Sequence, residues 1–211
     1  MGRIVYSVAA SLDGFNTDAE GGFDWAFPSQ EVIASLTDDP AGTAGILGGR
    51  RMYETMSGWE TDPSWAESSP EEARFAREWV RMDKVVFSRT LETVVTERTR
   101  IERELTIEAV ERAKAQTDGD LGVEGPTLAR RGLELGIVDV VELLVCPVVV
   151  GGGNPVFPTG LELPLRLGDL LGSVGQQGDR CRPRHEPCQI RREPVVELDP
   201  DRSRDVGCGE V

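Results

Sequence analysis

Short apolar runs of two kinds alternate along most of the chain. Runs rich in β-branched and aromatic residues predict strands at residues 3–10, 44–49, 84–91, 120–124 and 138–150, with a weaker strand at 99–105. Segments whose apolar residues recur every three or four positions predict helices at residues 28–36, 50–56, 71–82, 106–116 and 126–135. Strands that alternate with helices indicate an α/β fold, with a mostly parallel sheet flanked by helices on both faces.

Both periods stop after about residue 171. Residues 172–211 are rich in Arg, Pro, Gly, Asp and Cys, and they show no sustained apolar repeat. Such a composition is typical of disordered or loosely packed segments. We therefore expect one domain at residues 1–171, followed by an irregular or disordered tail at residues 172–211.

Charge and length narrow the functional classes. The chain has 211 residues, with 37 acidic residues against 23 Lys and Arg, and a net charge of -14. Phosphates would be repelled, so we expect neither a nucleic acid nor a membrane as a partner. No apolar run approaches the roughly 18 residues of a membrane helix, and the N-terminus lacks the apolar segment of a signal peptide. We expect a cytoplasmic protein with a small-molecule substrate.

The cysteines do not indicate a metal site. Cys146 lies in an apolar strand, where a buried structural thiol is the expected role. Thiolates and imidazole in the tail would suit zinc, but their spacing matches no standard zinc finger, and two prolines restrict the backbone between them. The tail residues concerned are Cys181, His185, Cys188 and Cys208.

Three of the expected strand ends carry residues suited to binding anions. Ligands in α/β sheets bind beyond the carboxyl ends of strands, where glycines let the backbone approach and guanidinium groups bind phosphate oxygens. Two separate arginine clusters suit a dinucleotide with a 2′-phosphate, although solvated surface charges that balance the acids are the alternative. No G-x-G-x-x-G follows the first strand, so a standard Rossmann site is not indicated. The three ends are Gly49-Arg50-Arg51, Ser88-Arg89 and Gly125-Pro126-Thr127.

These segments also resemble a known family. SLDG at 11–14, GRRMYE at 49–54, KVVFSRTL at 84–91 and the block from 119 to 157 resemble the dihydrofolate reductase-like superfamily. The likeness is closest to the reductase domain of bacterial riboflavin biosynthesis and its stand-alone relatives, and it covers about residues 1–165. It implies an NADPH-dependent oxidoreductase that transfers a hydride to a small heterocyclic or carbonyl-like substrate. A riboflavin-pathway pyrimidine of the 5-amino-6-(5-phosphoribosylamino)uracil type is one such substrate.

The resemblance also implies roles for particular residues. Gly49, Arg50 and Arg51 would contact the adenosine phosphates of NADPH, and Ser88 with Arg89 would contact the 2′-phosphate. The turn formed by Gly125, Pro126, Thr127 and Leu128 would approach the pyrophosphate through backbone N–H groups. The loop from residue 10 to residue 25 would cover the nicotinamide and the substrate.

Three departures from the family pattern qualify this assignment. Gln30 occupies the position of the acid of folate reductases, so Asp13 and Glu31 are the candidate catalytic acids. Glu31 lies about 100° further around the helix, and a turn-stabilising hydrogen bond is the alternative role for Asp13. Glu124 replaces a glycine and would repel the pyrophosphate unless its side chain points away.

The third departure is the absence of the family's closing strands from the tail, through either a diverged or a frame-shifted end. The strand at 138–150 would then keep an exposed edge, which favours a homodimer. Together the departures motivate the alternative of a degenerate, non-catalytic nucleotide-binding relative.

Overall fold

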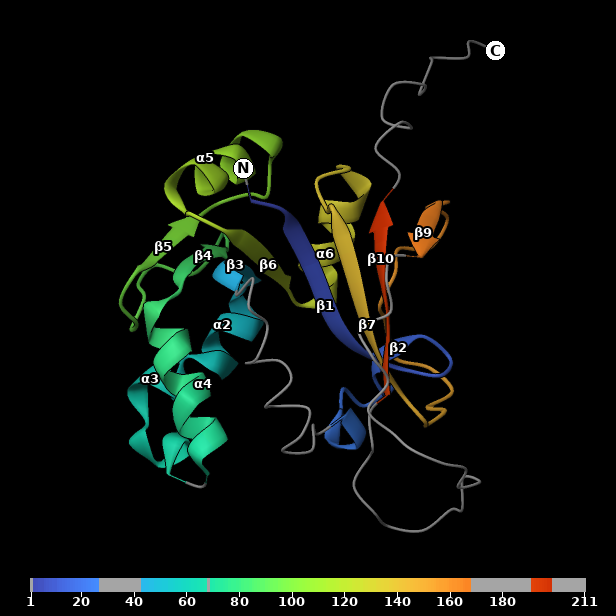
Figure 1. The fold of residues 1–211 in the computed structure, drawn as a ribbon, viewed down its shortest axis with the longest axis horizontal. Coiled ribbons are helices and arrows are strands. Elements are labelled where there is room, and N and C mark those ends of the chain that lie inside the picture. The colour runs from blue at the N-terminus through green and yellow to red at the C-terminus, as the bar shows by residue number, and fades with distance from the viewer. Residues whose placement is uncertain (1, 27–42, 68, 168–190, 199–211) are drawn as a thin grey trace.

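A computed structural model describes residues 2–26, 43–67, 69–167 and 191–198. Eight strands of the described chain form one sheet in the order β5-β4-β3-β6-β1-β7-β10-β9 (Figure 1). The strands from β5 to β7 are parallel to their neighbours, and β10 runs antiparallel to both β7 and β9. The bounds are β1 Ile4–Ser11, β3 Thr43–Gly49, β4 Asp83–Phe87, β5 Thr99–Glu102, β6 Asp120–Glu124, β7 Val140–Cys146, β9 Leu165–Leu167 and β10 Arg191–Leu198.

Helices connect the parallel strands, and a small second sheet pairs β2 with β8. The bounds are α2 Arg50–Met56, α3 Gly58–Thr61, α4 Pro70–Arg81, α5 Ile107–Gln116 and α6 Pro126–Glu134, with 3-10 turns η1 Asp24–Ala26 and η2 Pro63–Ala66, and short strands β2 Phe15–Thr17 and β8 Asn154–Pro155. The predicted α/β fold is confirmed. The helix predicted at residues 28–36 lies outside the described residues.

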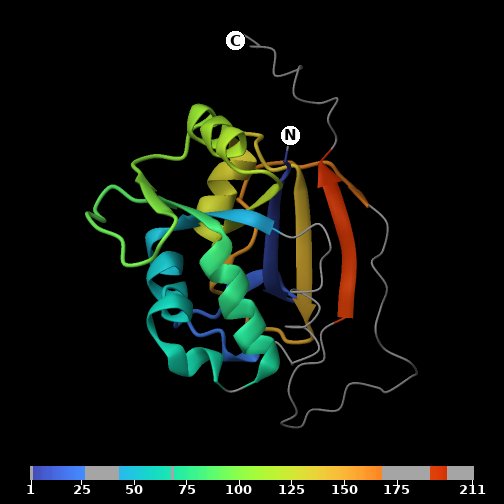
Figure 2. The same cartoon turned by 60° about the vertical axis from the view of Figure 1, so that its left-hand side comes forward.

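The main core lies between the sheet and the helices α5 and α6. Its members include Tyr6, Leu47 and Val123 from the strands, with Val110 from α5 and Leu133 from α6. Successive side chains of a strand point to opposite faces, so this core contains every second residue of each strand. On the other face, Trp79 of α4 lies beside Lys84 of β4. Figure 2 shows helices on both sides of the sheet.

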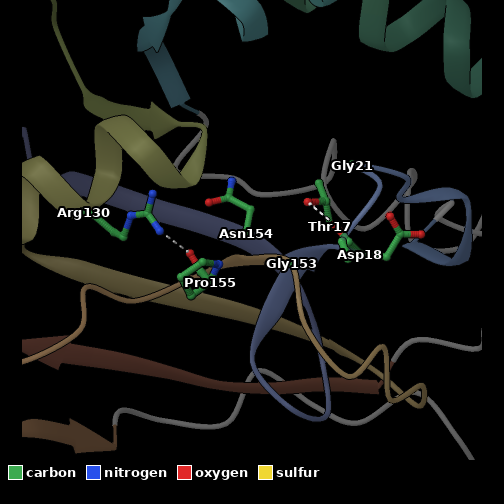
Figure 3. A pocket seen from close by; sticks show the side chains of 8 residues that line it. Thr17, Asp18, Gly21, Arg130, Gly153, Asn154 and Pro155 are labelled. Carbon is green, nitrogen blue, oxygen red and sulfur yellow. Dashed lines mark hydrogen bonds between the residues drawn. The ribbon is translucent and has the colours of Figure 1, made fainter.

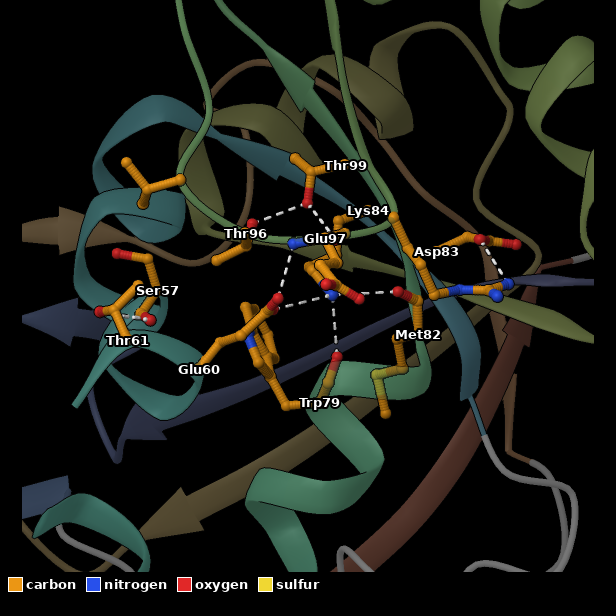
Figure 4. A network of polar contacts seen from close by, with 12 residues as sticks. Ser57, Glu60, Thr61, Trp79, Met82, Asp83, Lys84, Thr96, Glu97 and Thr99 are labelled. Carbon is orange, nitrogen blue, oxygen red and sulfur yellow. Dashed lines mark hydrogen bonds and ion pairs between the residues drawn. The ribbon is translucent and has the colours of Figure 1, made fainter. Parts of the chain in front are cut away.

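A buried polar network joins α3, α4 and β4 on that second face (Figure 4). Lys84 is 1% exposed, and its Nζ donates to Trp79 O at 2.9 Å and to Met82 O at 3.1 Å. Its charge faces Glu60 Oε2 at 3.5 Å, and Glu60 Oε1 accepts from the backbone N–H of Glu97 at 2.6 Å. Burial, above all, lowers the pKa of Lys84. The network satisfies carbonyl groups at the end of α4 and fixes that helix to the sheet.

Strand β10 corrects the expectation that residues 172–211 contain no closing strand. Residues 191–198 pair with β7, with a register shift between Arg192 and Val195, where Pro194 has no N–H to donate. The outer edge of β7 needs hydrogen-bond partners, and a short, charged segment supplies them without an apolar repeat that the sequence could reveal. The exposed edge on which a homodimer was expected is therefore covered. The remaining tail lies outside the described residues.

Two further findings concern the described residues only. None of their helices is both long and apolar enough to cross a bilayer. Within the same part of the chain, no group of three His, Cys, Asp or Glu side chains could hold a metal ion. The cysteines and the histidine of the tail lie outside this part, whereas Cys146 is buried, as expected.

Candidate cofactor and substrate site

Three turns meet at one edge of the sheet. Strand β3 lies between β4 and β6, and Gly48 pairs with both Val86 and Glu124. The three strands are parallel, so their carboxyl ends lie at the same edge. The Gly49-Arg50, Ser88-Arg89 and Glu124-Gly125 turns are therefore neighbours. The structure thus brings the predicted cofactor residues together.

Arg50 connects two of these turns directly. Its Nη1 donates to Thr90 Oγ1 at 3.1 Å, in the turn after β4, while its Nε donates to Glu54 Oε1 at 2.7 Å within α2. The Arg50 side chain is 47% exposed. Beside it, a Cβ added to Gly49 would meet no atom within 4 Å, so this turn is open to a ligand. Arg51 is also exposed.

The turn after β4 is shaped by a serine. Ser88 is 8% exposed, and its Oγ accepts from the N–H groups of Thr90 at 3.3 Å and Leu91 at 3.0 Å. This hydroxyl takes backbone donors that a longer strand would have used, so β4 ends at Phe87 and not at the predicted residue 91. Arg89 remains exposed at the tip of the turn. The sequence analysis did not include Thr90 among the candidate cofactor residues, because it lies beyond the predicted Ser88-Arg89 pair.

The turn before α6 requires glycine. Gly125 has a φ of +88°, a value that side-chain-bearing residues rarely adopt. Its carbonyl accepts from the N–H groups of Leu128 and Ala129, which starts the helix. Pro126 has no N–H, and that of Leu128 is used by Gly125, so these two residues offer no free N–H to a pyrophosphate. Of the four residues expected to approach the pyrophosphate through backbone N–H groups, Pro126 and Leu128 therefore cannot do so.

Glu124 does not point at that turn. Its Oε1 lies 3.3 Å from where a Cβ on Gly122 would be, so the carboxyl group folds back over Gly122. Burial raises the pKa of Glu124 to about 7. A carboxyl group in this position is largely protonated below neutral pH and is directed away from the Gly125 turn. The repulsion expected from the sequence is therefore weakened.

Ser7 and Glu142 form a hydrogen-bonded pair on the neighbouring strands. Ser7 pairs with Glu142 in register, and its Oγ donates to Glu142 Oε2. In β1 and β6, Val5 pairs with Gly122, and Ser7 and Glu124 each lie two residues further along. Because strand side chains alternate, Ser7, Glu124 and Glu142 share one face of the sheet. Their spacing along the chain does not indicate this grouping.

Asp13, one of the two candidate catalytic acids, joins the loop after β1 to the loop after β7. Its carboxylate accepts from the N–H groups of Val150 at 3.2 Å and Gly151 at 2.7 Å. The Ser11 hydroxyl, foremost, and these amides hold the pKa of Asp13 below its usual value. These contacts fit the turn-stabilising alternative, and a catalytic role for Asp13 stays a prediction. Glu31 lies outside the described residues.

A hollow of about 600 Å³ lies between the loop after β2, the strand β8 and the first turns of α6 (Figure 3). Arg130 of α6 lines it, and its Nη1 donates to Pro155 O at 3.1 Å. The hollow is next to the Gly125 turn, because Arg130 also approaches Thr127 Oγ1 at 3.5 Å. Its lining is Thr17, Asp18, Ala19, Gly21, Arg130, Gly153, Asn154 and Pro155.

The comparisons agree with this architecture. The family model described as RibD C-terminal domain matches residues 3–170. The chain belongs to the RibD C-terminal domain family. The sequence is also similar to that of YyaP, an uncharacterized protein of Bacillus subtilis (strain 168). It is 28% identical over 156 residues, which cover 74% of this chain and 80% of YyaP.

Solved structures of RibD-type and folate reductases share the fold. A Shewanella sp. PV-4 protein assigned to riboflavin biosynthesis matches with a TM-score of 0.62 at 18% identity, over 94% of this chain and 99% of that one. Dihydrofolate reductase from Enterococcus faecalis matches with a TM-score of 0.58 at 11% identity, over 95% and 98%. The Thermotoga maritima deaminase/5-amino-6-(5-phosphoribosylamino)uracil reductase matches with 0.57 at 12% identity, over 94% of this chain and 57% of that one. The resemblance stated from the sequence is thereby confirmed.

Proposed function

We propose that the chain is an NADPH-dependent reductase of a small heterocyclic substrate. The observation that carries the proposal is the meeting of the Gly49-Arg50, Ser88-Arg89 and Gly125 turns at one edge of the sheet. Two neighbouring arginines and a glycine turn give separate positions for the phosphates of a dinucleotide. The E. faecalis dihydrofolate reductase was solved with NADP(H), and this supports the same cofactor here.

The residues present fit such a cofactor. Gly49 faces open space, and a Cβ on Gly125 would come no closer than 3.8 Å to its nearest neighbour, Met52 Cβ. Arg50, Arg51 and Arg89 are exposed and cationic in a chain of net charge -14. When bound, NADPH supplies the hydride, and the protein supplies binding, orientation and a proton. Arg50, Thr90 and Arg89 would bind the adenosine phosphates, while the loop that Asp13 fixes would limit water.

Glu124 is our candidate for the proton donor in place of Gln30. A general acid works best when its pKa is near the working pH, and the pKa of Glu124 is about 7. Its carboxyl group lies on the sheet face that also presents Ser7 and Glu142, beside the carboxyl end of β6. Glu124→Gln should therefore lower turnover while NADPH affinity stays within about twofold, and its pH–rate profile should lose the limb near pH 7.

Titration of the purified protein with NADPH and with NADH, followed by cofactor fluorescence, tests the proposed cofactor. We expect NADPH to bind at least about tenfold more tightly, because a charged hydrogen bond contributes about 1.5–3 kcal/mol. Arg50→Ala should remove most of that preference, because it should weaken NADPH binding more than NADH binding. Equal affinities for the two dinucleotides in the wild-type protein would contradict the proposal.

Arg81→Ala is the matched control. Arg81 also forms an ion pair within a helix, with Glu78 at 3.2 Å, but it ends α4 at the opposite edge of the sheet. The control removes one positive charge and one surface ion pair without touching the three turns. Its ratio of NADPH to NADH affinity should equal that of the wild type.

Consumption of NADPH separates a reductase from a degenerate relative. The substrate panel should include 5-amino-6-(5-phosphoribosylamino)uracil, dihydrofolate and a quinone. NADPH oxidation is followed by absorbance at about 340 nm, and each rate is compared with the rate measured without enzyme. The T. maritima neighbour, a reductase of the first compound, motivates that choice. Tight NADPH binding with no oxidation above the blank for any acceptor would favour the non-catalytic alternative, which the glutamine at position 30 motivates.

A further inference from the structure

The turn that carries Arg89 is closed from outside by an arginine of the next strand. Arg103 directly follows β5, which ends at Glu102. Its Nη1 donates to Ser88 O at 3.0 Å and to Leu91 O at 2.8 Å. One nitrogen of the guanidinium group therefore joins the two ends of the segment 88–91.

The same turn is held from inside by Ser88. The Ser88 hydroxyl accepts the N–H groups of Thr90 and Leu91, and the Ser88 N–H donates to Glu102 O at 2.9 Å. Backbone groups of the segment are thus engaged on both sides, while the side chains of Arg89 and Thr90 remain exposed. Thr90 in turn accepts from Arg50. A continuous set of hydrogen bonds runs from Arg103 through the turn to Arg50.

We propose that Arg103 is a positioning residue for a 2′-phosphate site. It fixes the turn 88–91 so that Arg50, Arg89 and Thr90 present one surface that recognises a phosphomonoester. The inference rests on the proposed function, and it adds a residue that neither the sequence motifs nor the strand-end pattern indicated. Without Arg103, Leu91 O would turn to water, and the turn would have to be ordered again at each binding event, which weakens binding.

The geometry distinguishes positioning from charge. A lysine side chain ends one bond before the position of Nη1, so an ammonium group cannot reach both carbonyl oxygens while the backbone stays in place. Arg103→Lys keeps the positive charge but loses the bridge, whereas Arg103→Met loses both. If positioning dominates, the two variants should behave alike. If only the nearby charge matters, Arg103→Lys should resemble the wild type.

The test measures binding of adenosine 2′,5′-bisphosphate, NADPH and NADH to the full-length protein by calorimetry. Arg103→Met and Arg103→Lys should each weaken adenosine 2′,5′-bisphosphate and NADPH on the order of tenfold, with NADH within about twofold. Amide hydrogen exchange at residues 88–91 should also become faster in both variants, a readout that needs no ligand. Arg112→Met is the matched control, because Arg112 is exposed on α5 and pairs with Glu102 at 3.2 Å without contacting the turn.

Each outcome decides a separate point. Unchanged affinity for adenosine 2′,5′-bisphosphate in Arg103→Met, or wild-type affinity in Arg103→Lys, would overturn the positioning role and leave the proposed function intact. A wild-type protein that does not bind adenosine 2′,5′-bisphosphate would contradict both the positioning role of Arg103 and the proposed NADPH-dependent function. Equal losses of NADPH and NADH affinity, or an equal loss in Arg112→Met, would show general destabilisation and also overturn the inference. Should Arg103→Met fail to fold, Arg103→Lys alone decides.

Discussion

Glu124 makes the stability of the fold depend on pH in an unusual direction. Its carboxyl group lies over Gly122, and burial raises its pKa from 4.5 to about 7. The unfolded side chain releases its proton near pH 4.5, whereas the folded one keeps it up to about pH 7. The folded state therefore binds more protons between these values, and stability falls as the pH rises through this window. The contribution of the neutral carboxyl group is complete below pH 4.5 and is lost above pH 7.

The size of the effect follows from the same two values. At about 1.4 kcal/mol for each tenfold change in proton affinity, a rise from 4.5 to about 7 corresponds to about 3.5 kcal/mol at most. Partial contact of Glu124 with solvent reduces the effect further. Glu124→Gln keeps the size and polarity of the side chain but cannot ionise. The variant should unfold like the wild type at pH 4.5 and should be about 2–3 kcal/mol more stable than the wild type at pH 8.

Urea unfolding, followed by tryptophan fluorescence at several pH values, measures this difference. Glu111→Gln, which changes an exposed glutamate of α5, controls for the altered net charge. A stability difference between Glu124→Gln and wild type that stays constant from pH 4.5 to pH 8 would refute the buried, protonated carboxyl group. A stabilisation by Glu124→Gln that is larger at pH 4.5 than at pH 8 would refute it as well.

Two further predictions concern the scaffold. Lys84→Met should destabilise the fold by about 3–5 kcal/mol, because it leaves the Glu60 carboxylate buried without its cation. Adding Glu60→Gln should recover part of that loss in a double-mutant cycle by urea unfolding, and strictly additive effects would contradict the coupling. Ser69→Ala should cost about 1 kcal/mol in the same assay, since the Ser69 Oγ accepts from the Glu72 N–H at 3.1 Å and caps α4. No measurable loss would show that the cap is replaced by water.

The sequence determined the elements whose causes are local. The strand at Ile4–Ser11 follows from its β-branched and aromatic run, and the start of α4 follows from Ser69 with Pro70. The positions of the three turns that follow β3, β4 and β6 were also predictable, because glycine or arginine stands where each apolar run ends. Strand lengths were predicted less well. The predicted strand at 138–150 is observed only as Val140–Cys146.

Tertiary structure decided what depends on partners distant in the chain. Strand β10 forms because the edge of β7, some 50 residues earlier in the chain, offers unpaired backbone groups; no repeat within residues 191–198 signals it. The direction and pKa of Glu124 depend on the space over Gly122 and on burial by other elements. From the sequence alone, Arg103 and Lys84 are indistinguishable from ordinary surface cations. Their roles follow from the carbonyl groups that the fold places beside them. Periodicity and propensity are set by near neighbours in the chain, whereas burial and hydrogen-bond partners are set by packing, and the chemistry of this site depends on the latter.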